Sequence, residues 1–582
     1  MNIRNANSIV KELRRRAGMT QEEFAADICS VQSLSRIETG KSGISYIMLK
    51  KFMEKAGINS NVYPAFRDKR DCDIFRKLYL CQRYIDVWML EEAAQILGEV
   101  AELQYGDNRL HYQECLCYQC VILLKSGMEK EVNNFLEEAI KITRPEYHLE
   151  EIDTYWLSNT EIRLLLSLSY NYLIMGEIEI CEKMIAVMDS CLDKLQAEEK
   201  ERAVWKVKNG MIQAASLIKR GQFTGAKGVL KKWHIHAIKN KIYTEVPVIL
   251  FLQGICDIHM GDKEKGRNTI SNCYYSAKAL GNSLADFIIS YVQREFPDSI
   301  TKTEFTKKHI VLPSMEWAPA SENSNQNHEK NYYLGDFIRD VRVEKGIKQS
   351  VLCKGLCNKS TLSKIENNTL IPELEIMEAL LQRLGIHTDA FQIYTNIKTY
   401  SFYELKYDLS AVVMETTKEE ADRLFGLLLK TVNEKSAVQR QYVLYIWGML
   451  EQERSKKQFL LREALYQTQP DFHIAYIQDF VFTFQEMMIL IQIAKSLENN
   501  TTKAIFILYK LLEYVQIWKY ETLEKVRIQK EIILVLSELL LAEKRFNEMK
   551  QIGRYIDNLL ITGDYQSLSF IYENVFISLA FT

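Results

Sequence analysis

The sequence contains few residues that interrupt helices. Its 582 residues include 24 glycines and 8 prolines, well below the usual shares of about 7 % and about 5 % in soluble proteins. Hydrophobic residues make up 47 % of the chain and charged residues 26 %, as is ordinary for a globular protein. So few turn formers favour long helices, and the length exceeds what one core can hold. The sequence therefore predicts an all-α protein of several domains.

The features of several other protein classes are missing. No apolar run approaches the roughly 18 residues of a membrane span, and no secretory signal pattern opens the chain. The nine histidines form no His-Glu metal motif, and we find neither a glycine-rich phosphate loop nor a nucleophile elbow. We therefore expect a cytoplasmic protein that is not an enzyme, needs no cofactor and does not contact a membrane.

The twelve cysteines are scattered along the chain. The densest cluster is Cys115, Cys117 and Cys120, with His111 about one turn earlier. On a helix, Cys115 and Cys117 point about 200° apart, so they cannot share a tetrahedral metal centre. We expect buried core thiols in a reducing compartment and no metal.

Charge is unevenly distributed although the net charge is only −2. Residues 1–70 contain 13 Lys and Arg against 7 Asp and Glu, a net charge of +6, whereas residues 331–395 contain 8 of each kind. A basic segment on an acidic remainder is typical of a protein that contacts phosphate at one place.

One motif occurs twice, at a constant offset of 328 residues. Its first copy is GMTQEEFA at 18–25 followed by SVQSLSRIETG at 30–40, and its second is GIKQSVLC at 346–353 followed by NKSTLSKIENN at 358–368. Repetition on this scale indicates a duplicated architecture.

The first copy has the local signals of two short helices joined by a tight turn. Gly18 ends a first helix, Thr20 and Glu23 form a capping box, and Ser30 caps a helix that we expect from Val31 to Glu38. This is the helix-turn-helix arrangement, whose second short helix lies in the major groove of DNA.

The runs TQEEFA at 20–25 and LSRIETGK at 34–41 resemble the XRE (lambda- and 434-type repressor) helix-turn-helix family. The resemblance implies that Arg14 pairs with Glu38 inside the fold and that Gln21 contacts phosphate. It implies the following DNA-binding residues: Gln21, Val31, Gln32, Ser33, Arg36 and Lys41 in the first copy, and Gln349, Lys359, Ser360, Thr361 and Lys364 in the second. In the major groove, Gln suits adenine and Arg suits guanine.

The second copy departs from the pattern at its caps. Lys348 replaces the capping Thr, which weakens the start of its second helix by roughly 1 kcal/mol. Asn368 stands where the first copy has Gly40, which is tolerable because Asn also adopts the left-handed conformation. Its exposed face differs too, so the two copies would read different half-sites. Two interpretations stay open: a second DNA-binding module, or a degenerate copy retained for packing.

Segments with helical periodicity follow each copy of the motif. In the first half they are separated by breaks at Gly127, Gly176, Gly221 and Gly261. Small side chains follow three of the breaks by five residues, where they let paired helices pack closely: Cys181, Ala226 and Gly266. This pattern resembles the tetratricopeptide repeat. Glu161 and Glu486 begin similar apolar segments at an offset of 325, so we interpret the chain as one unit, module plus repeats, duplicated and fused.

An XRE module followed by helical repeats resembles the RRNPP family of peptide-pheromone-responsive regulators. The resemblance implies that the repeats bind a short peptide in a groove, where Asn or Gln amides clamp its backbone. Our peptide-binding candidates are Asn171, Asn209 and Gln253, which lie on the first helices of their pairs.

The predicted domains follow from these segments. They are a helix-turn-helix domain at 1–66, helical repeats at 70–312, a polar linker at 313–330, a second helix-turn-helix domain at 331–395 and second repeats at 398–582. We expect a regulator that binds double-stranded DNA and a peptide, as an intramolecular pseudo-dimer or a homodimer. The alternative is an antitoxin-like scaffold whose repeats bind a protein partner.

Overall fold

The computed structural model describes most of residues 10–280 and 332–580. Within these ranges the description omits 12, 16, 40, 43, 57–64, 67, 104–108, 127–131, 146–147, 149–151, 153–155, 196–198, 241, 371, 389–401, 403–404, 407–408, 410–417, 498–499 and 563–564, and between them it includes only 312. The predicted linker at 313–330 lies outside the described residues. Two compact units make up the chain, one with Met1–Asn61 and Ala65–Asn331 and the other with Val62–Pro64 and Tyr332–Thr582.

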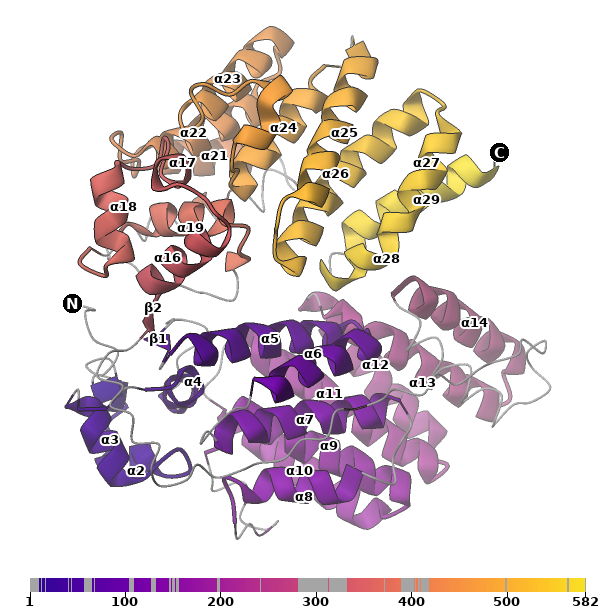
Figure 1. Ribbon diagram of the computed structural model, residues 1–582. Coiled ribbons are helices and arrows are strands. Elements are labelled where there is room, and N and C mark those ends of the chain that lie inside the picture. The colour runs from indigo at the N-terminus through magenta and orange to yellow at the C-terminus, as the bar shows by residue number, and fades with distance from the viewer. Residues whose placement is uncertain are drawn as a thin grey trace. The chain divides into compact units, whose positions relative to one another are not determined.

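The first unit begins with three short helices, α2 (Gln21–Ala25), α3 (Val31–Glu38) and α4 (Tyr46–Lys55), which together with the helical turns before α2 form its head. After a two-residue strand, β1 (Ala65–Phe66), ten longer helices follow (Figure 1). They are α5 (Lys69–Asp86), α6 (Leu90–Glu102), α7 (Arg109–Lys125), α8 (Val132–Lys141), α9 (Asn159–Met175), α10 (Ile178–Lys194), α11 (Glu199–Lys219), α12 (Phe223–Lys239), α13 (Val246–His259) and α14 (Lys263–Leu280), with a 3₁₀ turn, η3 (Tyr243–Glu245), before α13.

These ten helices stack as successive pairs. Each first helix (α5, α7, α9, α11 or α13) packs against the second helix of its pair and against the first helices of the adjacent pairs. Gly176, Gly221 and Gly261 adopt positive φ at the turns, a conformation that costs glycine little. Gly266 lies so close to α13 that a Cβ there would come within 2.6 Å of the Gly254 carbonyl oxygen. The predicted repeats and their small residues are confirmed, and Gly127 lies outside the described residues.

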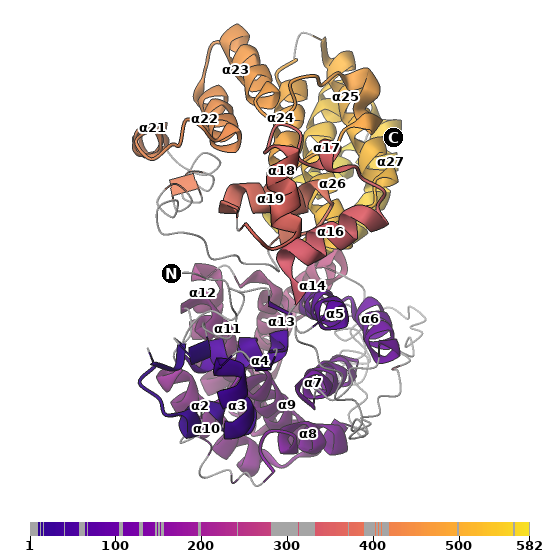
Figure 2. The same ribbon diagram turned by 60° about the vertical axis from the view of Figure 1, so that its left-hand side comes forward.

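The second unit has the same order of elements (Figure 2). Its head comprises β2 (Tyr332–Tyr333), α16 (Leu334–Glu344), α17 (Gln349–Leu352), α18 (Lys359–Glu366) and α19 (Leu374–Arg383). Its repeats are α21 (Lys418–Leu429), α22 (Ala437–Leu450), α23 (Arg454–Tyr466), α24 (Phe484–Lys495), α25 (Thr501–Ile517), α26 (Thr522–Ala542), α27 (Phe546–Ile552), α28 (Ile556–Leu559) and α29 (Tyr565–Ala580), with 3₁₀ turns η5 (Ile474–Asp479), η7 (Gly553–Tyr555) and η8 (Leu560–Thr562).

The helix boundaries of the two units match along the chain. Helices α3 and α18, and likewise α4 and α19, begin and end 328 residues apart. At the start of α9 and α24 the offset is 325, because Ser158–Glu161 and Thr483–Glu486 form equivalent capping boxes. From α12 and α27 onward it is 323, since Phe223 and Phe546 begin these helices. The chain is therefore a tandem duplication of a whole unit, a head with its own helical repeats.

Candidate DNA-binding and ligand-binding sites

The predicted caps of the first head are present. The Glu23 backbone N–H donates to Thr20 Oγ1 over 3.2 Å, and the Thr20 N–H donates to Glu23 Oε2 over 2.7 Å. The backbone hydrogen bond from Thr20 lowers the pKa of the Glu23 carboxyl. Ser30 caps α3 by accepting from the Ser33 N–H at 3.1 Å. These caps fix the helix-turn-helix geometry of the first head.

The second head lacks the equivalent of the Thr20 cap. Lys348 makes no side-chain hydrogen bond to the start of α17, which is only four residues long. Asn358 caps α18 through the Thr361 N–H at 2.7 Å, and Asn368 adopts a φ of 56°. The prediction of a less well capped second copy is confirmed.

The same three side chains form an inner network in both heads. Arg14 forms a bidentate pair with Glu38 at 2.6 and 3.1 Å, and Gln21 Nε2 donates to the same carboxylate at 2.8 Å. In the second head, Arg342 pairs with Glu366 at 2.6 and 3.0 Å and Gln349 Nε2 donates at 2.7 Å. The Glu38 carboxylate is nearly buried, which by itself raises its pKa, but Arg14 and Gln21 hold the pKa below its usual value.

The network gives Gln21 and Gln349 a role that the sequence did not indicate. Each amide nitrogen is held by a glutamate of the helix that follows the turn, so each glutamine joins the two short helices. The phosphate contact implied by the resemblance stays a prediction.

The two predicted recognition helices point different side chains outward. On α3, Leu34 and Ile37 are buried in the core, whereas Val31, Gln32 and Arg36 are exposed, as is Lys41 beyond the helix, and Ser33 is half-buried. On α18, Leu362 and Ile365 are buried, Lys359, Ser360 and Lys364 are exposed, and Thr361 is half-buried. All these candidates lie where a groove-binding helix needs them, with one face neutral apart from Arg36 and the other carrying two lysines.

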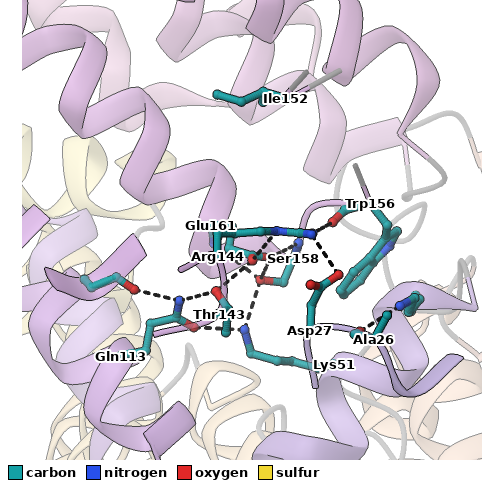
Figure 3. Close-up of polar contacts among 12 residues, drawn as sticks. Ala26, Asp27, Lys51, Gln113, Thr143, Arg144, Ile152, Trp156, Ser158 and Glu161 are labelled. Carbon is teal, nitrogen blue, oxygen red and sulfur yellow. Dashed lines mark hydrogen bonds and ion pairs between the residues drawn. The ribbon is translucent and has the colours of Figure 1, made fainter. Parts of the chain in front are cut away.

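A buried polar cluster joins the first head to its repeats (Figure 3). From α4, Lys51 Nζ donates to Gln113 Oε1 at 3.0 Å and to Ser158 Oγ at 3.1 Å. Gln113 Nε2 donates to Thr143 Oγ1 at 2.7 Å, and Thr143 Oγ1 donates to Glu161 Oε1 at 2.8 Å. We call this cluster the head–repeat junction.

Arg144 extends the junction to the turn after α2. Its guanidinium lies 2.8 Å from the Asp27 carboxylate and 3.3 Å from that of Glu161. Burial alone would raise the pKa of Glu161, but Lys51, Arg144 and the Ser158 cap hold it below its usual value. The first head is thus held by a charged, hydrogen-bonded contact.

The second unit repeats the junction with a different cation. Gln441 donates to Thr468 at 2.6 Å and Thr468 donates to Glu486 at 2.5 Å, as Gln113, Thr143 and Glu161 do in the first unit. In place of Lys51 and Arg144, Arg383 of α19 donates to Glu486 Oε1 at 2.6 Å. Arg383 also donates to the carbonyl oxygens of Leu352, Lys354 and Thr468, and neither Arg383 nor Glu486 has any exposed surface.

The residues of the junction were not among the predicted site residues. Only Glu161 and Glu486 gave a signal, as the start of two similar segments 325 residues apart. Each is the last residue of a capping box, and this pattern in the sequence would have placed the start of α9 and α24.

The three predicted peptide-binding residues differ in exposure. Asn171 and Asn209 have no exposed surface. Asn171 Nδ2 donates to Asn133 Oδ1 on α8, and Asn209 Nδ2 donates to Ile185 O at 3.1 Å on α10 and to Asp189. Both side chains tie a first helix to the second helix of the preceding pair, and the Oδ1 atom of each is buried without a hydrogen bond. Gln253 on α13 is half-buried. Their role in peptide binding stays a prediction.

The cysteine cluster on α7 belongs to the core. Cys115, Cys117 and Cys120 are buried, and His111 Nε2 lies 3.3 Å from the Asp71 carboxylate. Within the described part of the chain, no group of His, Cys, Asp and Glu side chains has the arrangement of a metal site. No described helix is long and apolar enough to cross a bilayer.

Comparison with known proteins identifies the heads. A helix-turn-helix family model matches residues 10–60 and 338–391. No curated protein sequence matches the chain. Among solved structures, PlcR of Bacillus thuringiensis in complex with the peptide PapR7 and DNA is 15 % identical, with a TM-score of 0.29, over 50 % of this chain and 98 % of that one. Apo ComR of Streptococcus vestibularis is 16 % identical, with a TM-score of 0.30, over 51 % and 99 %.

The family matches cover both copies of the motif and coincide with the two heads. Each head carries the inner network and an exposed helix after the turn, and each is followed by its own helical repeats. The chain thus contains two helix-turn-helix DNA-binding domains of the XRE type, each followed by a tetratricopeptide-like stack of helices.

Proposed function

We propose that the chain is a transcription regulator whose two heads bind one operator together and whose repeats sense a short peptide. The observation that carries the proposal is the contrast between the heads. Their inner networks agree residue by residue, whereas their exposed faces differ. Agreement inside preserves the shape that enters a major groove, and difference outside changes the bases that are read.

A single chain with two unlike heads fits an asymmetric operator. Gln32 and Arg36 can form bidentate hydrogen bonds with adenine and guanine, while Lys359 and Lys364 favour guanine or phosphate. Because both heads belong to one chain, the second binding event is intramolecular and needs no association of two molecules.

The head–repeat junctions offer a route from ligand to DNA. Lys51 belongs to the head, whereas Gln113, Ser158 and Glu161 belong to three segments of the repeats. A peptide that binds one arrangement of these helices more tightly than another shifts the population of head positions. Peptide sensing is tested by whether synthetic peptides change the affinity of the full chain for its operator.

DNA binding is tested by selecting an operator from random DNA and footprinting it. We expect two unlike half-sites protected by one chain. Arg36→Ala should relax base preference in one half-site and Lys364→Ala in the other, each by roughly 1–3 kcal/mol of discrimination. Lys354→Ala, outside the exposed face of α18, is the control. A strict palindrome protected by two chains would contradict the proposal.

A second candidate function is a scaffold that binds a protein partner. The second helices α23 and α25 of the second unit expose large apolar side chains, with Phe459 61 %, Phe506 55 % and Ile517 62 % exposed. Scattered apolar residues are ordinary on surfaces, but three large ones on adjacent repeats favour a docking face. Recovery of one stoichiometric protein partner, lost in Phe459→Ser, would support this function.

A further inference from the structure

Three cations of the first unit lie on consecutive first helices. They are Lys125 on α7, Arg163 on α9 and Lys208 on α11, and all three are half-buried. Helices α7 and α9, and α9 and α11, pack directly against each other. The three side chains therefore belong to the surface that the first helices form together, the surface that helical repeats use for extended ligands.

Aromatic rings hold these cations in place. The Arg163 guanidinium lies 5.1 Å from the ring centre of Tyr118 and 5.4 Å from that of Trp205. Lys208 Nζ lies 5.5 Å from the same Trp205 ring, and Lys125 Nζ lies 4.2 Å from that of Trp88. Cation–π contacts orient a cation but leave its hydrogen-bond donors available.

Carboxylates do not balance the cluster. Lys208 has a carboxylate partner, Glu245 at 3.5 Å. Lys125 donates to a backbone carbonyl, that of Ile85 at 2.8 Å. Among the described residues, no carboxylate lies within ion-pair distance of Arg163 or Lys125. Burial lowers the pKa of Lys125 to about 8, with Lys208 and Arg163 adding to this effect and Glu245 and Asp86 opposing it.

A second observation also indicates a missing acceptor. Trp205, which lies beneath both Arg163 and Lys208, is 5 % exposed, and its indole N–H is buried without a hydrogen-bond partner. A buried donor without an acceptor costs roughly 1–3 kcal/mol, so such groups are rare in folded proteins. Three cations and this N–H together offer donors to an anionic oxygen.

The second unit has lost the cluster at the matching positions. Tyr118 corresponds to Ile446 at the offset of 328, and Arg163 to Met488 at 325. Trp205 corresponds to Ile528 and Lys208 to Glu531 at the offset of 323. The duplicated fold needs neither the cations nor the aromatic rings, since the second unit packs the same helices without them. The cluster is therefore not required for folding of the repeats.

We propose that Lys125, Arg163, Lys208 and Trp205 form a carboxylate-binding subsite for the peptide, present in the first unit and absent from the second. The inference rests on the proposed peptide sensing and names the chemistry that is recognised. The carboxylate is either the free C-terminus of the peptide or an Asp or Glu side chain. Arg163 supplies a planar pair of donors suited to a carboxylate.

The subsite adjoins a hydrogen-bonded path to the head. Tyr118, which faces Arg163, donates to Glu114 Oε1 at 3.1 Å, and Lys50 of α4 lies 3.1 Å from the same oxygen. A carboxylate that draws Arg163 away from Tyr118 changes the surroundings of Glu114, whose pKa Lys50 and Arg163 both hold low against the effect of burial. Ligand binding and head position are thereby coupled through neighbouring side chains.

The test uses the full chain and two synthetic heptapeptide libraries, one with a free C-terminal carboxylate and one with a C-terminal amide. Retained peptides are sequenced by mass spectrometry, and the affinity of individual peptides is then measured. Loss of binding in the amide library identifies the C-terminus as the anion, whereas enrichment of Asp or Glu at one position in both libraries identifies a side chain. Either result supports the subsite.

Variants connect the result to the cluster. Arg163→Gln and Lys208→Gln should each weaken the selected peptides roughly 10- to 100-fold, and Arg163→Lys should restore part of the loss. Arg220→Gln is the matched control, because Arg220 pairs with Glu182 in the same repeats. Unchanged thermal melting would show that the variants fold.

Two outcomes would overturn the inference and are distinguishable. Peptides retained without any preference for a carboxylate, or retained equally by Arg163→Gln, would exclude the subsite while leaving peptide sensing intact. If the wild-type chain retains no peptide from either library, peptide sensing itself is wrong and the subsite with it.

Discussion

The buried pair of Arg383 and Glu486 gives the sharpest prediction for stability. The Arg383 guanidinium satisfies one carboxylate and three backbone carbonyl oxygens, and neither side chain reaches solvent. Arg383→Met keeps the apolar stem but leaves these four acceptors buried. Breaking a buried ion pair from one side costs about 3–5 kcal/mol, a large fraction of the stability of a domain.

The effect should appear in the second unit. Several domains do not unfold as one two-state system, so local stability is best measured by hydrogen exchange of amides in α19 and α24. The matched control is Arg423→Met, since Arg423 pairs with Glu420 on the exposed surface of α21, where an ion pair contributes about 0–1 kcal/mol. If Arg383→Met accelerates exchange no more than Arg423→Met, the account of the junction is wrong.

The pH dependence of the variant provides an independent check. Burial alone raises the pKa of Glu486, but in the wild type Arg383 and the hydrogen bonds from Thr468 and Thr483 hold it below its usual value. Its contribution is therefore present above the unfolded pKa of about 4.3 and is lost only as pH falls through the lower folded value. Without Arg383 the carboxyl is buried alone, its folded pKa rises, and the variant should be less destabilised at about pH 5 than at about pH 7.

Three further predictions follow from the caps, the core thiols and the junction of the first unit. Thr20→Ala should destabilise the first head by about 1 kcal/mol and Lys348→Thr should stabilise the second by a similar amount, as thermal melts would show; equal and opposite shifts are not expected if α17 is held by packing alone. Cys115 and Cys120, whose pKa values burial raises well above the ordinary range, should react with a thiol reagent at about pH 8 only after unfolding, and rapid reaction of the native chain would contradict their burial. Lys51→Met should leave Gln113 and Ser158 without their donor and cost roughly 1–3 kcal/mol, measured as faster amide exchange in α4.

Signals that lie close together in the sequence predicted structure well. The helix expected from Val31 to Glu38 has these bounds, because Ser30 caps it and apolar residues mark its buried face. The weak cap at Lys348 and the left-handed Asn368 were equally local. These features depend on a few neighbouring residues and on backbone geometry, which a sequence displays directly.

Prediction was wrong where a break interrupts an apolar segment. The periodicity at 473–495 favours one helix, but the chain forms the 3₁₀ turn η5 at 474–479, with Tyr476 outside helical geometry, and α24 begins at Phe484. The capping box of Thr483 and Glu486 decides where the helix starts, and it outweighs the apolar pattern before it.

The junctions could not have been predicted. Lys51 and Gln113 are 62 residues apart, and Lys51 and Ser158 are 107 apart. Polar residues at such separations give no periodic signal, and their partners follow from the stacking of helices. The burial of Asn171 and Asn209 has the same cause, since each is covered by the preceding pair of helices.

The fusion of two units changes what a single substitution can do. In a regulator assembled from two identical chains, every change on a recognition helix appears in both copies and must suit both half-sites at once. Here a change in α3 leaves α18 untouched, and Arg163 could be kept in one unit while Met488 occupies its place in the other. Each unit can therefore specialise by single steps, the first in sensing and grip and the second in the bases that it reads.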